Sequence, residues 1–441
     1  MKIKKISVRK LFGVFDHDIP INKKGGITII IGENGLGKTI VLEMVEALFT
    51  GKYFYFNSIA FEKLILEFTD GVKWELNKEE QKDDFPIISL KQINKNGSSY
   101  KPYRLLNYQP DDLISLARRI SRHIPHIRMV GPRMWEDRRT GEIFHADELV
   151  YRFGDYLPFG VRLDDKEKPK WFTDKHDQIN VSLIETQRLI SLQDREEKSH
   201  EKTVEKYSSQ LSRIIKSSLT ESTELSSKLD RTYPNRLIER LKTSSNVSDK
   251  VLNTELARLE KKRETLDAVG LIEIEKDSNL LEIENPQEVI KDVLMLYVED
   301  SFKKIEIFDT IARKIGLLLE IINKRFKHKR FYVEKESGFV FRSTIIKDAH
   351  GEFQKIPVTK LSSGEQNELV LFYELLFKSS PNSFILIDEP EVSLHISWQN
   401  CFIEDLKEIA ELNNLEVLIA THSPDIIANN WDLKVELKGL E

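Results

Sequence analysis

The strongest constraint on this chain is a glycine-rich octapeptide near its start, GENGLGKT at 32–39. It fits the pattern G-x-x-x-x-G-K-[ST], and its surroundings fit as well. The β-branched run GITIII (26–31) precedes it and predicts a buried strand, while TIVLEMVEALF (39–49) follows it and predicts a helix. A loop of this kind between a strand and a helix predicts an α/β domain that binds the phosphate chain of a nucleotide.

Each residue of the loop has an expected role. Its glycines let backbone N–H groups face the phosphates, and the helix start adds a partial positive charge. Lys38 is expected to reach the β- and γ-phosphates of ATP, and the Thr39 hydroxyl is expected to hold Mg²⁺. The predicted nucleotide-binding residues here are Gly32, Asn34, Gly35, Gly37, Lys38 and Thr39.

Two later strands end in residues that suit the same chemistry. FILIDEPEVSLH contains a buried strand that ends in Asp388 and Glu389. A carboxylate there is expected to bind Mg²⁺, which favours Asp388 as the metal ligand, and the next carboxylate, Glu389, is expected to polarise a water molecule. IATHSPD places His422 after another apolar strand, where we expect it to sense the γ-phosphate. The order of these motifs along the chain is the specific signal.

A second helix start with anion-binding character lies far along the chain, in KLSSGEQNE at 360–368. Ser362 and Glu365 have the S-x-x-E spacing of a capping box, which fixes where the helix begins. Ser362, Ser363 and Gly364 are then expected to bind a phosphate that approaches from outside.

Together, the P-loop, LSSGEQ, ILIDEPEVSLH and THSP resemble the ABC-type ATPases that do not transport. These include the SMC and Rad-type proteins, the RecF type and the overcoming-lysogenization-defect (OLD) family. The resemblance covers roughly 1–50 and 355–441. It departs from the usual signature by having Ser363 in place of Gly and Glu365 in place of Gln, which are departures common in the OLD-like branch.

The resemblance implies why the chain has two phosphate-binding helix starts. In that family the signature helix of one subunit closes over the ATP held by the P-loop of another, so we expect a homodimer or higher homo-oligomer. It also implies that Gln187, in VSLIETQRLI, touches Mg²⁺ and the attacking water. Ser393-Leu394-His395 resembles the dimer-contacting loop. Phe12 and Phe15 are the candidates for stacking on adenine.

The expected architecture is an ABC-type P-loop ATPase head of the α/β class, with an inserted β meander and a long α-helical coiled-coil arm. We expect an N-terminal lobe with the meander at 1–189, the helical arm at 190–330 and a C-terminal lobe at 331–441. Within the arm, one helix is expected to end at Tyr233-Pro234. Another is expected to start at Asn285-Pro286 and to continue to Phe326. The stretch from the helix near 110–122 to about 178 is expected to be irregular.

Composition adds limits on location. The chain has 40% hydrophobic and 32% charged residues, a net charge of −5, and Cys401 as its one cysteine, which excludes an internal disulfide. It has no signal-peptide pattern and no apolar run of membrane-spanning length. We expect a cytoplasmic protein with no membrane contact.

Three functional classes compete. One is a defence ATPase that senses a trigger, such as DNA or a viral protein, and controls a separate effector. The others are a repair ATPase of the SMC, Rad or RecF kind that binds DNA directly, and the nucleotide-binding subunit of a transporter. The arm of 190–330 argues against the transporter subunit. The compact head, the short arm and the DEPE-x-x-LH string resemble ATPase subunits of bacterial antiviral systems, such as PtuA of Septu and AriA of PARIS, which favours the defence role.

Charge separates the first two classes. Residues 114–139 contain seven arginines and no lysine, which suits a DNA surface, an acidic protein partner, or pairing with nearby acids. These arginines are Arg118, Arg119, Arg122, Arg128, Arg133, Arg138 and Arg139.

The stretch after His422 reads SPDIIANNWDLKVELKGLE, enough for a helical turn and a closing strand. The middle region has no His-Cys cluster and no H-E-x-x-H. We therefore expect the effector to be a separate nuclease or Toprim-like protein.

Overall fold

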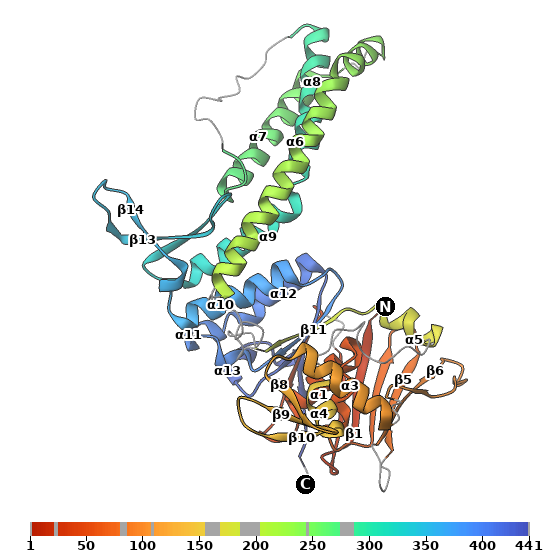
Figure 1. The fold of residues 1–441 in the computed structure, drawn as a ribbon. Helices are drawn as coiled ribbons and strands as arrows, with labels where there is room; N and C mark the ends of the chain where they lie inside the picture. Colours follow the sequence, from red (N-terminus) through yellow and green to blue (C-terminus); the bar gives the residue numbers. More distant parts are fainter. Residues whose placement is uncertain are drawn as a thin grey trace. The chain divides into compact units, whose positions relative to one another are not determined.

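The computed structural model describes residues 2–21, 25–79, 86–106, 110–154, 168–185, 203–243, 247–273 and 286–439. The chain divides into two compact units (Figure 1), Met1–Gln187 with Ser379–Glu441, and Arg188–Lys378. We call the first the head unit and the second the arm unit. The expected C-terminal lobe at 331–441 is divided between the two units at Ser379.

The head unit contains a five-stranded parallel sheet in the order β11-β15-β16-β3-β17. Asp388 pairs with Glu185 of β11 on one side and with Ala420 of β16 on the other. Strands β15 and β16 are buried along nearly their whole length, as expected for a parallel sheet covered on both faces. The strands are β3 (Ile27–Ile31), β11 (Val181–Glu185), β15 (Phe384–Asp388), β16 (Glu416–Ala420) and β17 (Lys434–Glu436).

Helix α1 (Lys38–Thr50) is the central helix of the head unit. Its buried residues Val41 and Val45 belong to the same hydrophobic core as Leu418 of the parallel sheet and Trp74 of a second, antiparallel sheet. Each fully buried side chain of this kind contributes about 1.5–3 kcal/mol. The helix that begins at the glycine-rich loop is therefore held by both sheets.

The antiparallel sheet has six strands in the order β2-β1-β4-β5-β6-β7. It confirms the predicted meander, and the chain turns at Asp70-Gly71 between two of its strands, β4 and β5. The strands are β1 (Ile3–Leu11), β2 (Phe15–Pro20), β4 (Lys63–Phe68), β5 (Lys73–Glu79), β6 (Ile87–Ile93) and β7 (Tyr103–Arg104).

The stretch that we expected to be irregular after α3 is structured in large part, so that expectation is wrong. A three-stranded sheet and two helices pack around Trp135 and Phe144, both fully buried. The strands have only three to five residues each, too short for an alternating pattern to be read in the sequence. The elements are α3 (Pro110–His123), β8 (Ile127–Gly131), β9 (Met134–Asp137), β10 (Ile143–His145) and α4 (Ala146–Phe153).

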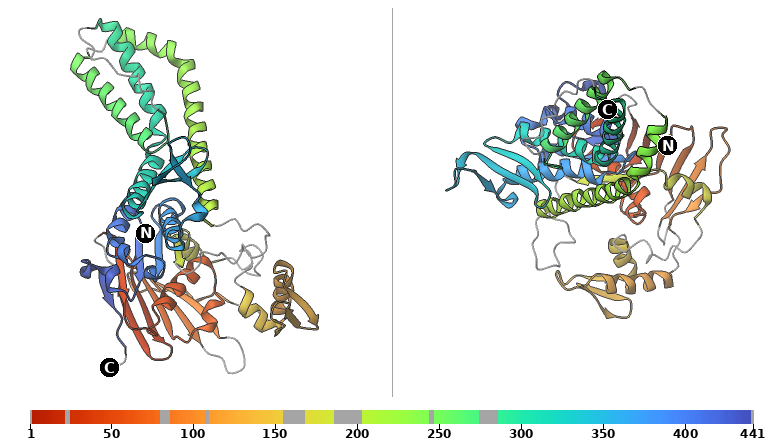
Figure 2. Two further views of the ribbon diagram at one scale, coloured as in Figure 1. Left: turned by 90° about the vertical axis from the view of Figure 1, so that its left-hand side faces the viewer. Right: turned by 90° about the horizontal axis from the view of Figure 1, so that it is seen from above.

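Long helices dominate the arm unit (Figure 2), and α6 and α7 both pack against α8. The predicted end of the first helix at Tyr233-Pro234 is wrong, since α6 continues past Pro234. The helix continues because α8 holds its last turns: Arg236 donates to Asp300 at 2.5 and 2.6 Å, and its guanidinium also donates to the Leu229 carbonyl at 2.9 Å. These ties offset the hydrogen bond that proline removes.

The helix that we expected to run from Asn285-Pro286 to Phe326 is two helices, α8 and α9, separated at Ile307-Phe308. The first of them begins at Glu288, shortly after Pro286, and Asn285 lies outside the described residues. On α7, Leu252, Leu256, Leu259 and Leu266 are buried. The helices are α6 (Thr203–Thr243), α7 (Asp249–Ala268), α8 (Glu288–Glu306) and α9 (Asp309–Arg325).

A three-stranded antiparallel sheet follows α9 and leads into α10 (Ser363–Tyr373), the helix that begins in the LSSGEQ segment. In this sheet β13 (Gly338–Lys347) pairs with β12 (Lys329–Glu334) on one side and with β14 (Phe353–Ile356) on the other. A short π-helical turn, Glu374–Lys378, continues α10.

The remaining helices and helical turns of the described residues are short, apart from α12, which lies between β15 and β16 in the sequence. They are α2 (Tyr55–Ser58), α5 (Lys170–His176), Val358–Lys360, Pro390–Val392, α11 (Ile396–Gln399), α12 (Phe402–Asn413), α13 (Pro424–Ile427) and Trp431–Leu433. None of the helices in the described ranges has both the length and the apolar character needed to cross a bilayer.

Candidate nucleotide site

Three sequence motifs come together at one edge of the parallel sheet. The strand order makes β11, β15, β16 and β3 direct neighbours, and all of them run in the same direction. Their carboxyl ends therefore meet at one edge, where open α/β sheets bind ligands. The glycine-rich loop follows β3, Asp388 ends β15, and His422 comes two residues after β16.

The glycine-rich loop has the backbone that its sequence predicts. Gly37, which precedes α1, has φ +83°, and a Cβ there would lie 2.5 Å from Leu11 Cδ2. Only glycine fits both the left-handed conformation and the close approach of β1. The buried His17 of β2 lies 2.8 Å from the carbonyl of Leu36 through Nε2, so the loop is also fixed from the antiparallel sheet.

Lys38 is buried and donates to carbonyl oxygens of its own loop, at 2.8 Å to Gly32 and 3.0 Å to Glu33. The ammonium group is thus held over the loop by two neutral acceptors. Phosphate oxygens are stronger acceptors for such a group because they carry charge. This position is suited to receiving the β- and γ-phosphates of a nucleotide.

The predicted metal ligands Thr39 and Asp388 are in direct contact. The Thr39 hydroxyl donates to the two carboxylate oxygens of Asp388 at 3.1 and 3.0 Å. Burial raises the pKa of Asp388 to about 6; the Thr39 hydrogen bond lowers it, and the charges of Glu389, Glu43 and Glu391 raise it. A buried carboxylate among other acids is a place where positive charge is favoured.

These residues fit a Mg²⁺ ion, which prefers oxygen ligands and is commonly bound through one or two carboxylates together with substrate phosphates. Among the described residues, no group of three or more His, Cys, Asp and Glu side chains converges to hold a metal. A magnesium ion here would be held by the Thr39 hydroxyl and the Asp388 carboxylate, with other oxygens coming from the nucleotide and water.

Glu389 has an unusual backbone conformation, with φ 44° and ψ 57°. Its N–H still donates to the Ala420 carbonyl at 2.9 Å, so the strain is held by the sheet. A left-handed conformation at a residue other than glycine costs about 1–2 kcal/mol. Such residues cluster at functional sites, which supports a chemical role for this carboxylate.

His422 is half exposed, at 48% of its side chain, and its Nδ1 lies 3.8 Å from Glu389 Oε1. Its closest acidic neighbour is Glu391, whose Oε1 is 3.0 Å from Nδ1. The same oxygen accepts the backbone N–H of His422 at 2.9 Å. Glu391, which we did not predict as a site residue, therefore links the segment after β15 to the segment after β16.

The predicted signature residues lie in the arm unit and form the predicted cap. The Ser362 side chain accepts the Glu365 N–H, and the Glu365 carboxylate accepts the Ser362 N–H at 2.9 Å, which confirms the capping box. Lys329 of β12 donates to Glu365 at 2.8 and 2.9 Å. Burial would raise the pKa of Glu365, but Lys329 and the Ser362 hydrogen bonds keep it below its usual value.

This network gives a physical reason for a departure from the usual signature. A glutamine in place of Glu365 could close the cap, but it would carry no charge to pair with Lys329. The residues that are expected to bind phosphate remain accessible. Ser362 and Ser363 are exposed, and a Cβ on Gly364 would have no neighbouring atom of the described residues within 4 Å.

The other predicted site residues have mixed outcomes. Gln187 lies outside the described residues, although β11, which leads to it, ends beside Asp388. Phe12 is 44% exposed and would lie 3.2 Å from a Cβ on Gly37, so it is next to the glycine-rich loop. Phe15 instead stacks on His17. In the Ser393-Leu394-His395 loop, the first two residues are buried and the histidine is exposed.

Three residues of the site were not predicted from the sequence: His17, Glu391 and Gln399. Gln399 is buried; its amide donates to the carbonyls of Glu391 and Leu394 at 3.3 Å, and it accepts from the Ser423 hydroxyl at 2.9 Å. The second glutamate of the DEPE string was a visible signal for Glu391. A His in an alternating strand and a Gln in a short helix have no pattern that marks them.

Comparison with known proteins identifies a family for this chain. The chain matches the family model AAA_15, described as an AAA ATPase domain, over residues 1–427. It belongs to this family of AAA ATPase domains. The family match agrees with the parallel sheet and the glycine-rich loop of the head unit.

Individual proteins match only part of this chain. UvrABC system protein A of Deinococcus radiodurans is 29% identical over 147 residues, which is 33% of this chain and 12% of that protein. The same protein of Listeria monocytogenes is 35% identical over 71 residues, or 16% of this chain and 7% of that protein. The chain therefore spans only about an eighth or less of the length of these relatives.

Solved structures with a similar course of the chain include two SMC heads. The Smc head domain of Pyrococcus furiosus, bound to the C-terminal domain of ScpA, has a TM-score of 0.34 and 14% identity and covers 97% of this chain and 91% of its own. The SMC head domain of Thermotoga maritima has a TM-score of 0.31 and 12% identity, with coverage of 97% and 91%. The fold assignment rests on the family match and the strand order, and these likenesses add nothing to it.

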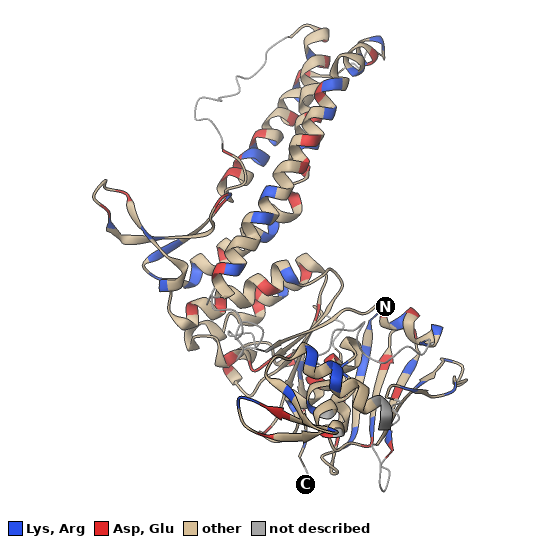
Figure 3. Ribbon diagram, in the orientation of Figure 1, with Lys and Arg blue, Asp and Glu red and all other residues tan. Residues whose placement is uncertain are grey.

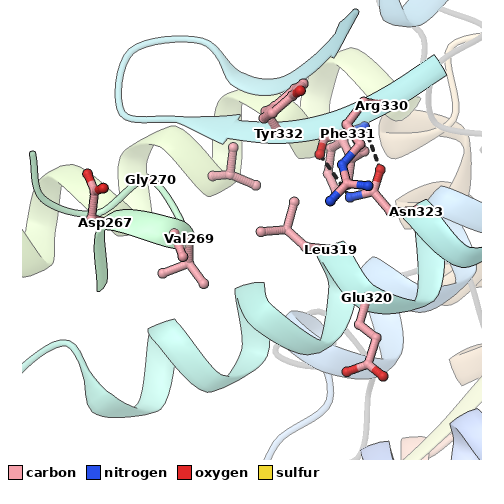
Figure 4. Close-up of a pocket in the computed structure, with 11 residues that line it drawn as sticks. Asp267, Val269, Gly270, Leu319, Glu320, Asn323, Arg330, Phe331 and Tyr332 are labelled. Atoms are coloured by element: carbon pink, nitrogen blue, oxygen red, sulfur yellow. Dashed lines mark hydrogen bonds between the residues drawn. The ribbon is translucent and has the colours of Figure 1, made fainter. Parts of the chain in front are cut away.

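A separate cavity of about 290 Å³ lies within the arm unit (Figure 4), between the end of α7, α9 and β12. Its lining includes Val269, Leu319 and Tyr332. Asn323, which also lines it, exchanges both of its hydrogen bonds with the backbone of Phe331, at 3.0 and 2.8 Å. The cavity contains none of the motif residues, so it is not part of the candidate nucleotide site.

Proposed function

We propose that this AAA ATPase domain is an ATP- and Mg²⁺-dependent switch that hydrolyses ATP and closes as a dimer over it. The observation that carries the proposal is the contact between Thr39 and Asp388 at the sheet edge, with Glu389 and His422 beside it. These residues come from three separate segments of the chain and meet only in the fold.

The roles of the residues follow from their chemistry. Lys38 and the loop N–H groups bind the phosphates, and Thr39 and Asp388 hold Mg²⁺. When bound, the metal neutralises phosphate charge during transfer. Glu389 accepts a proton from the attacking water, His422 contacts the γ-phosphate, and Gln187 is proposed to help orient that water.

The dimer is proposed because the chain has a second anion-binding helix start that its own glycine-rich loop does not explain. Ser362, Ser363 and Gly364 begin a capped helix and are open to solvent. A phosphate from another subunit fits that position, since the helix start supplies free N–H groups and a partial positive charge. The working unit is then a homodimer or a higher homo-oligomer.

Lys38→Ala tests the ATPase part. Loss of a charged hydrogen bond of this kind costs about 1.5–3 kcal/mol, so ATP affinity should fall by roughly 10- to 100-fold and turnover should fall with it. The measurement is ATP binding by calorimetry and phosphate release by the purified chain. Undiminished hydrolysis in the variant would sink the proposal. Lys101→Ala, at an exposed position of the head unit, serves as a control for loss of a lysine.

We further propose that the switch is the sensor or scaffold subunit of a cytoplasmic antiviral defence complex, which controls a separate nuclease or Toprim-like effector. The resemblance of the DEPE-x-x-LH string and the compact head to such subunits supports this role. The test is to purify the chain together with the product of a neighbouring gene and to assay nucleic-acid cleavage with ATP. Robust cleavage by the chain alone, lost on mutating a residue outside the ATP site, would contradict it.

Direct DNA binding is the second candidate function, and the arginine strip of residues 114–139 is the observation that favours it. Arg128 and Arg139 pair with Glu136 and Asp137, at 2.7 and 3.3 Å. Other arginines of the strip are exposed and form no side-chain ion pair with any residue that the structure describes; several basic residues lie along α3 in Figure 3. These arginines are Arg118, Arg122, Arg133 and Arg138.

The DNA-binding candidate predicts a salt-dependent affinity for duplex DNA. Reversing Arg118 and Arg122, which lie one turn apart on α3, should weaken binding and lower the salt slope by roughly 2, about 0.9 per lost phosphate contact. Fluorescence anisotropy with a labelled duplex at several salt concentrations measures both. The charge-matched control reverses two arginines at exposed positions of α6, Arg213 and Arg231. Affinity that does not change with salt, or no binding, would contradict a DNA-binding role for the strip and leave it a structural or protein-binding role.

A further inference from the structure

Glu391 lies close to the strand-end acids Asp388 and Glu389, but its side chain is buried against His422. Its side chain is only 7% exposed, although it is the third residue after Asp388 and belongs to a short helical turn. A buried carboxylate is costly unless hydrogen bonds stabilise it. The partners it has therefore indicate why it is there.

Among the described residues, the Glu391 side chain makes its two polar contacts with His422. Oε1 accepts the backbone N–H of His422 at 2.9 Å and lies 3.0 Å from ring Nδ1. Oε2 is buried and has no hydrogen-bond partner among the described residues. A two-point contact from one oxygen fixes both the backbone and the ring plane of the histidine, because the ring can turn only by breaking one of them.

The contact leaves the other ring nitrogen available. Nε2 of His422 makes no hydrogen bond with any residue in the described ranges, and the ring is half exposed. Such an arrangement is common where a carboxylate orients a functional histidine. The hydrogen bond at one ring nitrogen fixes the tautomer and leaves the other nitrogen to bind or react. Glu389 is 3.8 Å from the ring, too far for a hydrogen bond of this kind.

A second contact reinforces the geometry. The buried Gln399 accepts from the hydroxyl of Ser423, the residue after His422, and donates to the backbone carbonyl of Glu391. The loops after β15 and β16 are thus joined twice, once through the Glu391 side chain and once through Gln399. Rigid support of this kind holds a functional side chain within the narrow tolerance that catalysis needs.

We propose that Glu391 is a positioning residue for His422: its carboxylate holds Nδ1 inside the protein so that Nε2 faces the bound nucleotide. The inference rests on the proposed function, because that function assigns the γ-phosphate contact to His422. Glu391 itself touches neither the phosphate nor the metal ligands. Its loss should lower the rate of hydrolysis while leaving nucleotide binding nearly intact.

Kinetics test the proposal with a graded pair of substitutions. Glu391→Gln keeps an oxygen acceptor in the same space, and Glu391→Ala removes it. We expect kcat to fall by about tenfold or more in the alanine variant, with partial rescue by glutamine and a KM for ATP within about threefold of the parent. Glu411→Gln, an exposed change of the same chemistry on α12, should leave both constants unchanged. An unchanged kcat in Glu391→Ala would overturn the proposal.

A double-mutant comparison separates positioning from general damage. In a His422→Ala background, Glu391→Gln should have no further effect, since residues that act as a unit are not additive. An equal additional loss there would show that Glu391 acts by another route and would overturn the proposal. Failure of His422→Ala to lower kcat would instead contradict the role of His422 in the proposed function.

A spectroscopic readout tests the contact without any ATPase activity. The ¹⁵N signals of the histidine rings in the nucleotide-free protein report which nitrogen of His422 carries a hydrogen bond, with His422→Ala giving the assignment. We expect the Nδ1 signal to shift in Glu391→Gln and further in Glu391→Ala. A His422 spectrum that is the same in all three proteins would overturn the inference even if the chain hydrolyses ATP.

Discussion

A buried ion pair fastens the signature helix to the arm, and its removal should have a large effect on stability. Glu368 of α10 pairs with Arg325 at the end of α9, and their side chains are 0% and 4% exposed. The guanidinium also lies 4.8 Å from the centre of the Phe372 ring. Breaking such a pair by removing one partner costs about 3–5 kcal/mol, because the charge that stays behind is buried without its counter-ion.

Glu368→Leu is the perturbation that isolates this effect. It keeps a side chain of similar volume but leaves Arg325 charged, so the loss should fall near 3 kcal/mol if the Phe372 ring offsets part of the cost. The double variant Arg325→Met/Glu368→Leu removes both charges. It should recover most of the loss, since apolar replacement of a buried pair is often neutral or stabilising.

Urea unfolding of the arm helices, followed by circular dichroism, measures the difference in free energy of unfolding among the three proteins. A loss below about 1 kcal/mol for Glu368→Leu would refute the reasoning, and so would a double variant that is no more stable than the single one. The outcome also bears on function, because the same helix begins at the residues that we expect to meet a partner's ATP.

Three further predictions concern the nucleotide site. Gly37→Ala should weaken ATP binding and destabilise the head more than Gly35→Ala, since both glycines have positive φ but only Gly37 lacks room for a Cβ; thermal unfolding and ATP titration of the two variants give the comparison. Ser362→Ala should cost about 1 kcal/mol through loss of the cap, measured by urea unfolding, and a loss equal to that of Ser217→Ala, at an exposed position of α6, would contradict the cap's importance. Excess EDTA should stop ATP hydrolysis by the parent chain, with activity restored by added Mg²⁺, and hydrolysis that continues in EDTA would exclude the metal role given to Thr39 and Asp388.

The sequence predicted those parts of the fold that have a local physical cause. The strand before the glycine-rich loop, the helix after it and the capping box at Ser362 follow from short patterns, and the structure confirms them. The meeting of Asp388 and His422 also follows, because parallel strands that end at one edge bring their next residues together.

The rest depends on tertiary contacts that no short pattern reveals. Pro234 predicts a helix end, but ion pairs from Arg236 to a different helix override it. The short strands around Trp135 are defined by one small core and not by alternation. The contact between Glu391 and His422 joins residues from two loops, so only the strand order brings it about.

The proposed dimer requires that one subunit's signature helix closes over the ATP held by another. The mass of the Glu389→Gln variant in solution tests this claim, measured by light scattering with Mg²⁺ and either ATP or no nucleotide. Glu389→Gln keeps Asp388, so ATP should stay bound and the mass should double on adding it. A second change, Gly364→Asp, should abolish the doubling: the site around Gly364 has room for a side chain and the first helical turn favours Asp, but its charge would repel a phosphate. A monomer with bound ATP in Glu389→Gln, or an ATP-dependent dimer that survives Gly364→Asp, would contradict the claim.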